Sequence, residues 1–114
     1  MAEIRYNETA ILDLAIAQDF IREYFEGVQS PELAKNHITT FFEELARKLD
    51  LLEGNPELYP IRRELYYSET KKPVRSFTCH WFIVFYVYTK EDDTVTIWFI
   101  RSSKSDYSNV ITLF

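Results

Sequence analysis

Basic side chains in the second half of this chain could hold a phosphate backbone, because Lys and Arg bind phosphate through charge-assisted hydrogen bonds. These residues are Arg62, Arg63, Lys71, Lys72, Arg75, Arg101 and Lys104. His80 lies between them in the sequence. Its imidazole titrates near neutral pH and could act as a general base or acid, and Glu64 is a second candidate base. Alternatively, the basic residues form a solvated charged surface and His80 is a turn residue bonded to a backbone carbonyl.

The charge of the chain is unevenly distributed. Residues 1–59 carry 5 basic and 12 acidic residues, whereas residues 60–114 carry 8 basic and 6 acidic ones. The net charge of −5 argues against indiscriminate binding to nucleic acid, although a local basic patch could still bind it.

The length and composition predict one compact domain spanning residues 1–114. No run of about 18 apolar residues could span a membrane, and the first residues lack the plan of a signal peptide, so we expect a cytoplasmic protein. The one cysteine, Cys79, has no metal-ligand spacing around it and is predicted to be a small buried hydrophobe. We expect no metal and no cofactor.

Two helices and four strands are predicted along the chain. Apolar residues at steps of three and four indicate a helix from Glu8 to about Glu26, with Asn7 as its cap. A second helix begins with Ser30 as N-cap and Pro31 in its first turn, and ends before Gly54. β-Branched and aromatic residues then dominate three segments, and a short alternating segment precedes the first helix. These strands cover residues 3–7, 74–77, 81–89 and 94–101.

These elements predict an α+β fold with the order β-α-α-β-β-β, in which a helical hairpin packs on one face of a small antiparallel sheet. The last two strands are apolar on both faces, whereas a sheet open to water normally alternates apolar with polar residues. We therefore expect a partner-binding surface on the sheet, or a homo-oligomer when the partner is absent. Its predicted residues are Phe82, Val84, Tyr86, Trp98 and Ile100. Alternatively, residues 109–114 or the loop at 60–73 cover this face.

Three segments resemble the RelE/ParE superfamily of bacterial toxins from type II toxin-antitoxin modules. "NPELYPIRREL" is similar to the proline-and-arginine loop after the second helix of the family. "VRSFTCHWFIVFYVY" resembles the ParE-type pattern of an Arg-Ser-Phe strand followed by a strand that ends in two aromatics. "TVTIWFIRSSKSDY" resembles the last strand and the tail. The resemblance implies a plasmid-stabilisation-type toxin that a cognate antitoxin neutralises by folding a disordered segment across it.

RelE-like members of the superfamily cleave mRNA on the ribosome without a metal, and the resemblance supplies a set of residues for this chemistry. Arg75 and Arg101 would hold phosphate, His80 or Glu64 would serve as base, and Tyr107 as acid or stacking platform. The acidic chain and the segment "SSKSD" depart from this strongly basic type.

The Arg75-Ser76-Phe77 strand is similar to the ParE side of the superfamily, whose members inhibit DNA gyrase by protein contact. Three hypotheses therefore remain: a toxin that inhibits gyrase, a ribosome-dependent endoribonuclease, and a stable family member that is no longer toxic. The first is the one that the sequence favours.

Overall fold

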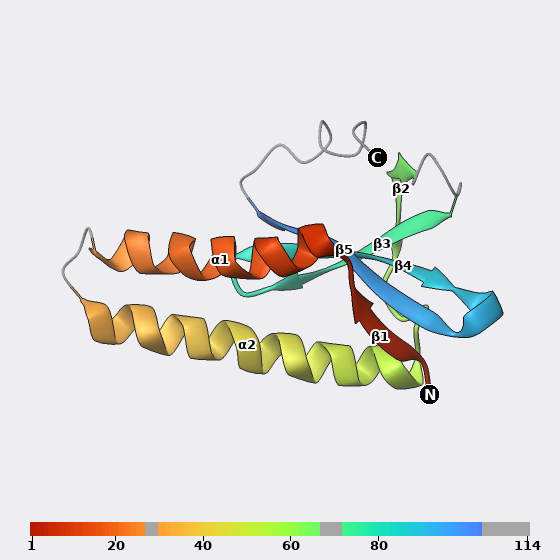
Figure 1. The fold of residues 1–114 in the computed structure, drawn as a ribbon, viewed down its shortest axis with the longest axis horizontal. Helices are drawn as coiled ribbons and strands as arrows, with labels where there is room; N and C mark the ends of the chain where they lie inside the picture. Colours follow the sequence, from red (N-terminus) through yellow and green to blue (C-terminus); the bar gives the residue numbers. More distant parts are fainter. Residues whose placement is uncertain (27–29, 67–71, 104–114) are drawn as a thin grey trace.

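The computed structural model describes residues 1–26, 30–66 and 72–103, and for residues 26 and 63–66 the backbone alone. Two antiparallel helices lie side by side over one face of a five-stranded sheet (Figure 1). The elements are β1 (Glu3–Tyr6), α1 (Glu8–Glu26), α2 (Pro31–Gly54), β2 (Ile61–Tyr66), β3 (Pro73–Cys79), β4 (Phe82–Thr89), a 3₁₀ turn (Lys90–Asp92) and β5 (Thr94–Ser102).

The helix boundaries predicted from the sequence are confirmed. Asn7 caps α1, because its Oδ1 accepts a hydrogen bond of 2.9 Å from the backbone N–H of Ala10. Ser30 stands at the N-cap of α2, but its hydroxyl makes no capping bond; Pro31 in the first turn favours the helix through its fixed φ instead. The end of α2 at Gly54 agrees with the expected stop.

The order β-α-α-β-β-β is also confirmed, with one strand more and one parallel pair. The strands lie in the order β1-β5-β4-β3-β2, and β1 runs parallel to β5 while the other pairs are antiparallel. The sheet is therefore mixed and not purely antiparallel. A parallel pair cannot be joined by a tight hairpin, and here both helices and the other three strands separate its two members in sequence.

The additional strand, β2, occupies an edge of the sheet where a loop was expected. Its sequence, IRRELY, carries three consecutive charged residues and so lacks the enrichment in β-branched and aromatic residues on which the prediction of strands depended. Charged side chains are typical of edge strands, because they discourage pairing with other chains.

The main core lies between the helices and the sheet. Four of the five residues predicted to contact a partner are in it, so that prediction is wrong for Phe82, Val84, Tyr86 and Ile100, which are at most 4% exposed. The sequence correctly predicted which side chains of β4 lie on the same face of the sheet. However, the helices cover the face of Phe82, Val84 and Tyr86, which was expected to be open. The opposing side chains from the helices include Ala17, Ile21, Phe41 and Leu45.

A second apolar cluster lies on the face of the sheet away from the helices. It comprises Val74, Phe85, Val87 and Phe99, all at most 4% exposed, with Ile83 and Trp98 partly buried against them. The rings of Phe85 and Phe99 stack at 4.5 Å. Among the described residues of this cluster, none is therefore exposed in the way that the sequence predicted for a large apolar patch. Of the alternative covers, residues 109–114 and most of the loop at 60–73 lie outside the described part of the chain.

A buried carboxylate joins α1 to the sheet. β1 pairs with β5 only from Thr94 to Ile97, so the next N–H on that edge of β5 needs another acceptor. Asp13 of α1, 7% exposed, accepts it: its Oδ2 lies 2.9 Å from the backbone N of Ile100 and also pairs with the guanidinium of Arg101. Arg101 in turn donates to the carbonyl of Ile100 at 3.0 Å. The helix thus continues the edge where the strand has ended.

Replacing Asp13 with Ala should lower the free energy of unfolding by about 3 kcal/mol, because it removes one partner of a buried, hydrogen-bonded ion pair. Urea unfolding measures this loss. Asp19→Ala is the matched control on the same helix, since Asp19 pairs with Arg22 but its side chain is 66% exposed; its cost should stay below about 1 kcal/mol. Equal losses for the two variants would contradict a special role for Asp13.

Candidate functional site

Exposed apolar side chains form a stripe along α1. Leu12, Ile16, Phe20 and Tyr24 are 65%, 62%, 43% and 59% exposed. Residues four apart lie on one side of a helix, so these four make a continuous ridge, and the buried face of α1 is formed by other residues. Single exposed apolar residues are ordinary, whereas these four make one contiguous exposed apolar surface.

Two adjoining hollows run beside this ridge, where α1 faces the end of β5. The first, about 320 Å³, includes Ile16, Phe20, Asp13 and Arg101 in its walls. The second, about 340 Å³, is lined by Phe20, Tyr24, Trp81, Ser102 and Ser103. Phe20 and Ser102 belong to both. We call the ridge with the two hollows the α1 groove.

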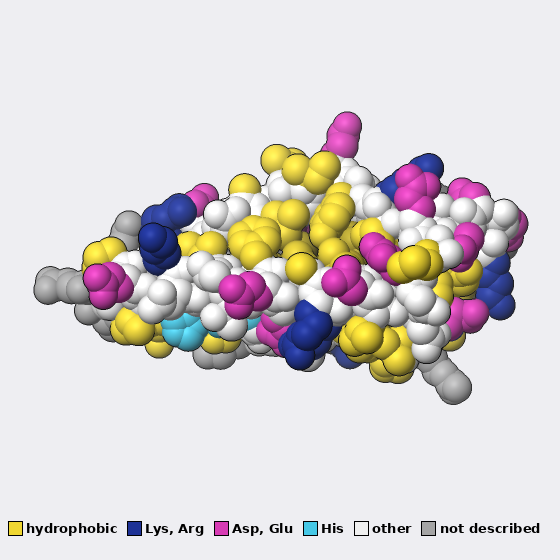
Figure 2. All heavy atoms as spheres, turned by 90° about the horizontal axis from the view of Figure 1, so that it is seen from below, with side chains coloured by type: hydrophobic (Ala, Val, Ile, Leu, Met, Phe, Trp, Pro, Cys, Tyr) yellow, Lys and Arg dark blue, Asp and Glu magenta, His cyan; other side chains and the backbone are white. Residues whose placement is uncertain are grey.

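The charge on α1 is mainly acidic. On the side of the molecule on which α2 lies, hydrophobic side chains gather in the middle, and both acidic and basic side chains lie around them (Figure 2). α1 itself carries five acidic residues and one basic residue, Arg22. A ligand complementary to such a surface is apolar on one side and basic at its margins.

Arg101 lies in the α1 groove but is already paired. Its guanidinium binds Asp13 and the carbonyl of Ile100, and it also lies 5.1 Å from the ring centre of Phe99. Because these contacts fix α1 on β5, the arginine has a structural role, and a phosphate would have to compete with a buried carboxylate for it.

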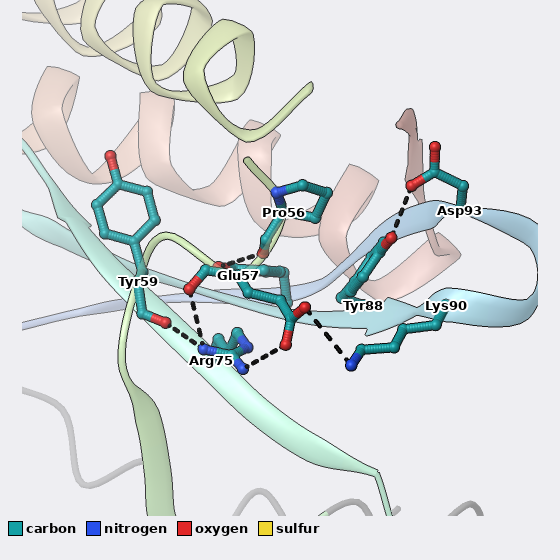
Figure 3. A network of polar contacts seen from close by, with 8 residues as sticks. Pro56, Glu57, Tyr59, Arg75, Tyr88, Lys90 and Asp93 are labelled. Carbon is teal, nitrogen blue, oxygen red and sulfur yellow. Dashed lines mark hydrogen bonds and ion pairs between the residues drawn. The ribbon is translucent and has the colours of Figure 1, made fainter. Parts of the chain in front are cut away.

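Arg75 is engaged by the loop that follows α2 (Figure 3). It donates to the carbonyls of Tyr59 at 2.7 Å and Glu57 at 3.2 Å, and pairs with the carboxylate of Glu57 at 3.3 Å. Lys90 approaches the same carboxylate at 3.6 Å. The side chain of Arg75 is only 14% exposed, so it holds this loop against β3 and presents little surface to a ligand.

His80 forms the turn between β3 and β4, as one of its two interpretations predicted. Its φ of 56° is left-handed, which few non-glycine residues adopt, and the carboxylate of Glu44 supports it by accepting the backbone N–H at 2.7 Å. Within the described part of the chain, the ring does not bond to a backbone carbonyl, which was the expected partner. Its Nε2 lies 2.9 Å from Nδ1 of His37 on α2.

Burial disfavours charge on the titratable groups around this turn. Desolvation, and then the neighbouring His37, lower the pKa of His80, although Glu44 opposes the shift. Partial burial would raise the pKa of Glu44, but the hydrogen bond from the His80 backbone and the nearby Lys48 outweigh it, so this pKa is lowered. Burial raises the pKa of Cys79 to about 12. Cys79 is fully buried, which confirms the prediction of a buried thiol.

Among the described residues, the two arginines predicted to hold phosphate for RNA cleavage do not lie together. Arg75 pairs with Tyr86 of β4, and Arg101 pairs with Ile83, three residues away on the same strand. That offset is about 10 Å along the strand, with two strand spacings across it. His80 is held by α2. Tyr107 and the side chain of Glu64 lie outside the described part of the chain.

The described members of the basic patch do not form one surface either. Lys72 and Arg75 line a hollow with Lys90, together with the carboxylates of Glu57 and Glu91. Arg62 lines a different hollow, beside Lys48, and Arg101 lies in the α1 groove. The positions predicted for Lys71, Lys104 and the side chain of Arg63 lie outside the described residues.

The exposed apolar ridge of the α1 groove was not predicted from the sequence. Leu12, Ile16 and Phe20 recur at steps of four along the helix, so the signal was present as an apolar stripe. The proximity of His37 and His80, 43 positions apart, had no local signal.

Tyr86→Phe should destabilise the protein by about 1 kcal/mol in urea unfolding, since it removes one hydroxyl that bonds to the carbonyl of Pro56 at 3.0 Å from a fully buried ring. The matched control is Tyr88→Phe. Tyr88 bonds to Asp93 at 2.7 Å near the surface, where water replaces the lost bond, so its loss should be smaller. The reverse order would contradict the role of the core hydroxyl in holding the loop after α2.

Comparison with known families places this small α+β protein in the RelE/ParE superfamily. Residues 4–107 match the family model described as "ParE toxin of type II toxin-antitoxin system, parDE", so the chain belongs to the ParE toxin family. Among solved structures, it is similar to one titled "Chromosomal ParDE TA system from P. aeruginosa", with a TM-score of 0.54 and 17% identity over 90% of this chain and 96% of that one. That likeness concerns the fold. No match was found among curated proteins. Within the described residues, no helix is long and apolar enough to cross a membrane.

Proposed function

We propose that this ParE-family toxin inhibits DNA gyrase in the cytoplasm by protein contact and that a cognate ParD-type antitoxin neutralises it. Membership of the family supports the toxin role. The observation that carries the choice of mechanism is the engagement of both candidate phosphate-binding arginines, Arg75 by a loop and Arg101 by Asp13. Cleavage of RNA needs cations that are available to the developing charge of the phosphorane.

The antitoxin occupies the α1 groove. The ridge offers apolar anchors at steps of four, which suits an amphipathic helix or an extended segment that folds on binding. Because acidic residues predominate on α1, the antitoxin segment carries Lys or Arg beside its apolar anchors. In the absence of antitoxin, the same ridge accounts for the expected tendency to form homo-oligomers.

Expression of the chain from a tightly regulated promoter, alone and with the neighbouring gene product, tests the function. We expect growth arrest that the neighbour reverses. Purified toxin should trap gyrase on cleaved DNA and yield no RNA fragments in a translating ribosome assay. RNA fragments without an effect on gyrase would replace the proposal by the endoribonuclease, and harmless soluble protein would indicate a member that is no longer toxic.

Leu12→Asp combined with Ile16→Asp should weaken antitoxin binding by about 100-fold, because each change removes an apolar anchor and adds charge to the contact. Isothermal titration calorimetry measures the affinity. Leu51→Asp on α2, 53% exposed and outside the groove, is the control and should leave the affinity unchanged. Equal effects of the two variants would place the antitoxin elsewhere.

A further inference from the structure

Both histidines of the chain meet at the end of the helical hairpin, and the ParE function leaves them unexplained. His37 lies in the second turn of α2 and His80 in the turn between β3 and β4. The ring of His37 stacks on Phe25 at 4.8 Å and lies 5.2 Å from the ring of Trp81. The 2.9 Å bond between the two imidazoles is thus the polar centre of an aromatic cluster that joins α1, α2 and the strand turn.

We propose that this histidine pair is an acid-sensitive latch, which holds the end of the helical hairpin on the β3–β4 turn while the facing nitrogens share one proton and releases it when both rings are charged. The proposal does not depend on the identity of the toxin's target.

The geometry allows one proton between the rings. A hydrogen bond from Nδ1 of one ring to Nε2 of the other requires one nitrogen to donate and one to accept. When both rings are imidazolium, both nitrogens carry hydrogen and face each other at a distance at which two cations repel. Full protonation therefore breaks the bond and separates α2 from the turn.

The other nitrogen of His80 strengthens this effect. Its Nδ1 is buried and has no hydrogen-bond partner within the described part of the chain. In the imidazolium form this atom must carry hydrogen, so the folded state would bury an unpaired, charged N–H. Desolvation and the charge of His37 lower the pKa of His80 accordingly.

The charged groups around the pair can compensate one imidazolium but not two. Glu44 on α2 favours a positive charge at His80, but it is already paired with Lys48 at 3.3 Å and lies 4.0 Å from Arg47. On β3, the thiol of Cys79 stays neutral, because burial raises its pKa to about 12. The side chains that α1 contributes to the cluster are the rings of Phe25 and Tyr24. Imidazole atoms are visible on the surface in Figure 2, so protons reach the pair from solvent.

The direction of the pH dependence follows from the lowered pKa of His80. The unfolded chain, with an ordinary histidine pKa of 6.5, binds protons that the folded latch resists. The pair therefore stabilises the fold fully above pH 6.5, and this contribution is lost as the pH falls below 6.5 toward the folded pKa. Release loosens Trp81, which is in the wall of the α1 groove.

Histidine-selective NMR of the wild-type protein tests the latch directly, since the chain has two histidines and both belong to it. We expect the signals of the two rings to change together as the pH falls below the ordinary histidine pKa of 6.5, in line with the lowered pKa of His80. In a Trp98→Phe background, the fluorescence of Trp81 should shift to the red over the same pH range. Ring signals that change independently of each other, with unchanged fluorescence, would overturn the proposal.

Two variants separate the latch from general acid sensitivity. His80→Asn keeps a residue that tolerates the left-handed backbone, and His37→Asn removes the other ring. Between pH 7 and pH 5, the melting temperature of the wild type should fall about 4 °C more than that of either variant. Because this comparison uses the slope with pH, an overall loss of stability in a variant does not obscure it. Equal slopes in all three proteins would also overturn the proposal.

Discussion

The arrangement of the helices on the sheet depends on the hydrogen bonds that the carboxylate of Asp13 accepts from β5. This carboxylate accepts the N–H of Ile100 on an edge of β5 that β1 is too short to cover, and it neutralises Arg101 beside it. A helix normally packs on a sheet through apolar contacts, which tolerate small sliding and rotation. A buried hydrogen bond with a charged partner has a narrow optimum, so it sets the rotation of α1 about its axis. That rotation determines which residues of the helix enter the core and which form the ridge of the α1 groove.

Two basic residues, Arg101 and Arg75, have structural roles, because the first fixes α1 and the second holds the loop after α2. Arg101 and Arg75 each bind backbone carbonyls as well as a carboxylate, so each closes a place where regular hydrogen bonding stops. Arginine suits such places, since its planar group donates to several acceptors at once. The two arginines that the sequence indicated for phosphate binding therefore hold the structure together instead: Arg101 at the contact of α1 with β5, and Arg75 at the contact of the loop with β3.

Local patterns in the sequence predicted most of the fold. Helix boundaries follow from capping residues and apolar spacing, and β3, β4 and β5 from their composition, because these signals act over a few neighbouring residues. β2 was missed since an edge strand with charged residues lacks that composition. The choice of which face of β4 the helices cover was wrong for Tyr86 and its neighbours, because alternation shows that a strand has two apolar faces and contains nothing about which one a helix meets. Asp13 and Arg101 are 88 positions apart, and His37 and His80 are 43 positions apart. Neither contact therefore has a local signal in the sequence.

The parallel pairing of β1 with β5 governs the order in which the protein can form. Glu3 pairs with Thr94 and Tyr6 with Ile97, so the first strand of the described chain has its partner among the last described residues. Until β5 is made, β1 has no strand to pair with, and Asp13 has neither Ile100 nor Arg101. Closing so long a loop is slow compared with forming a helical hairpin. A translation product that ends before β5 therefore yields paired helices with an uncovered apolar face, and the α1 groove exists only once β5 has been made.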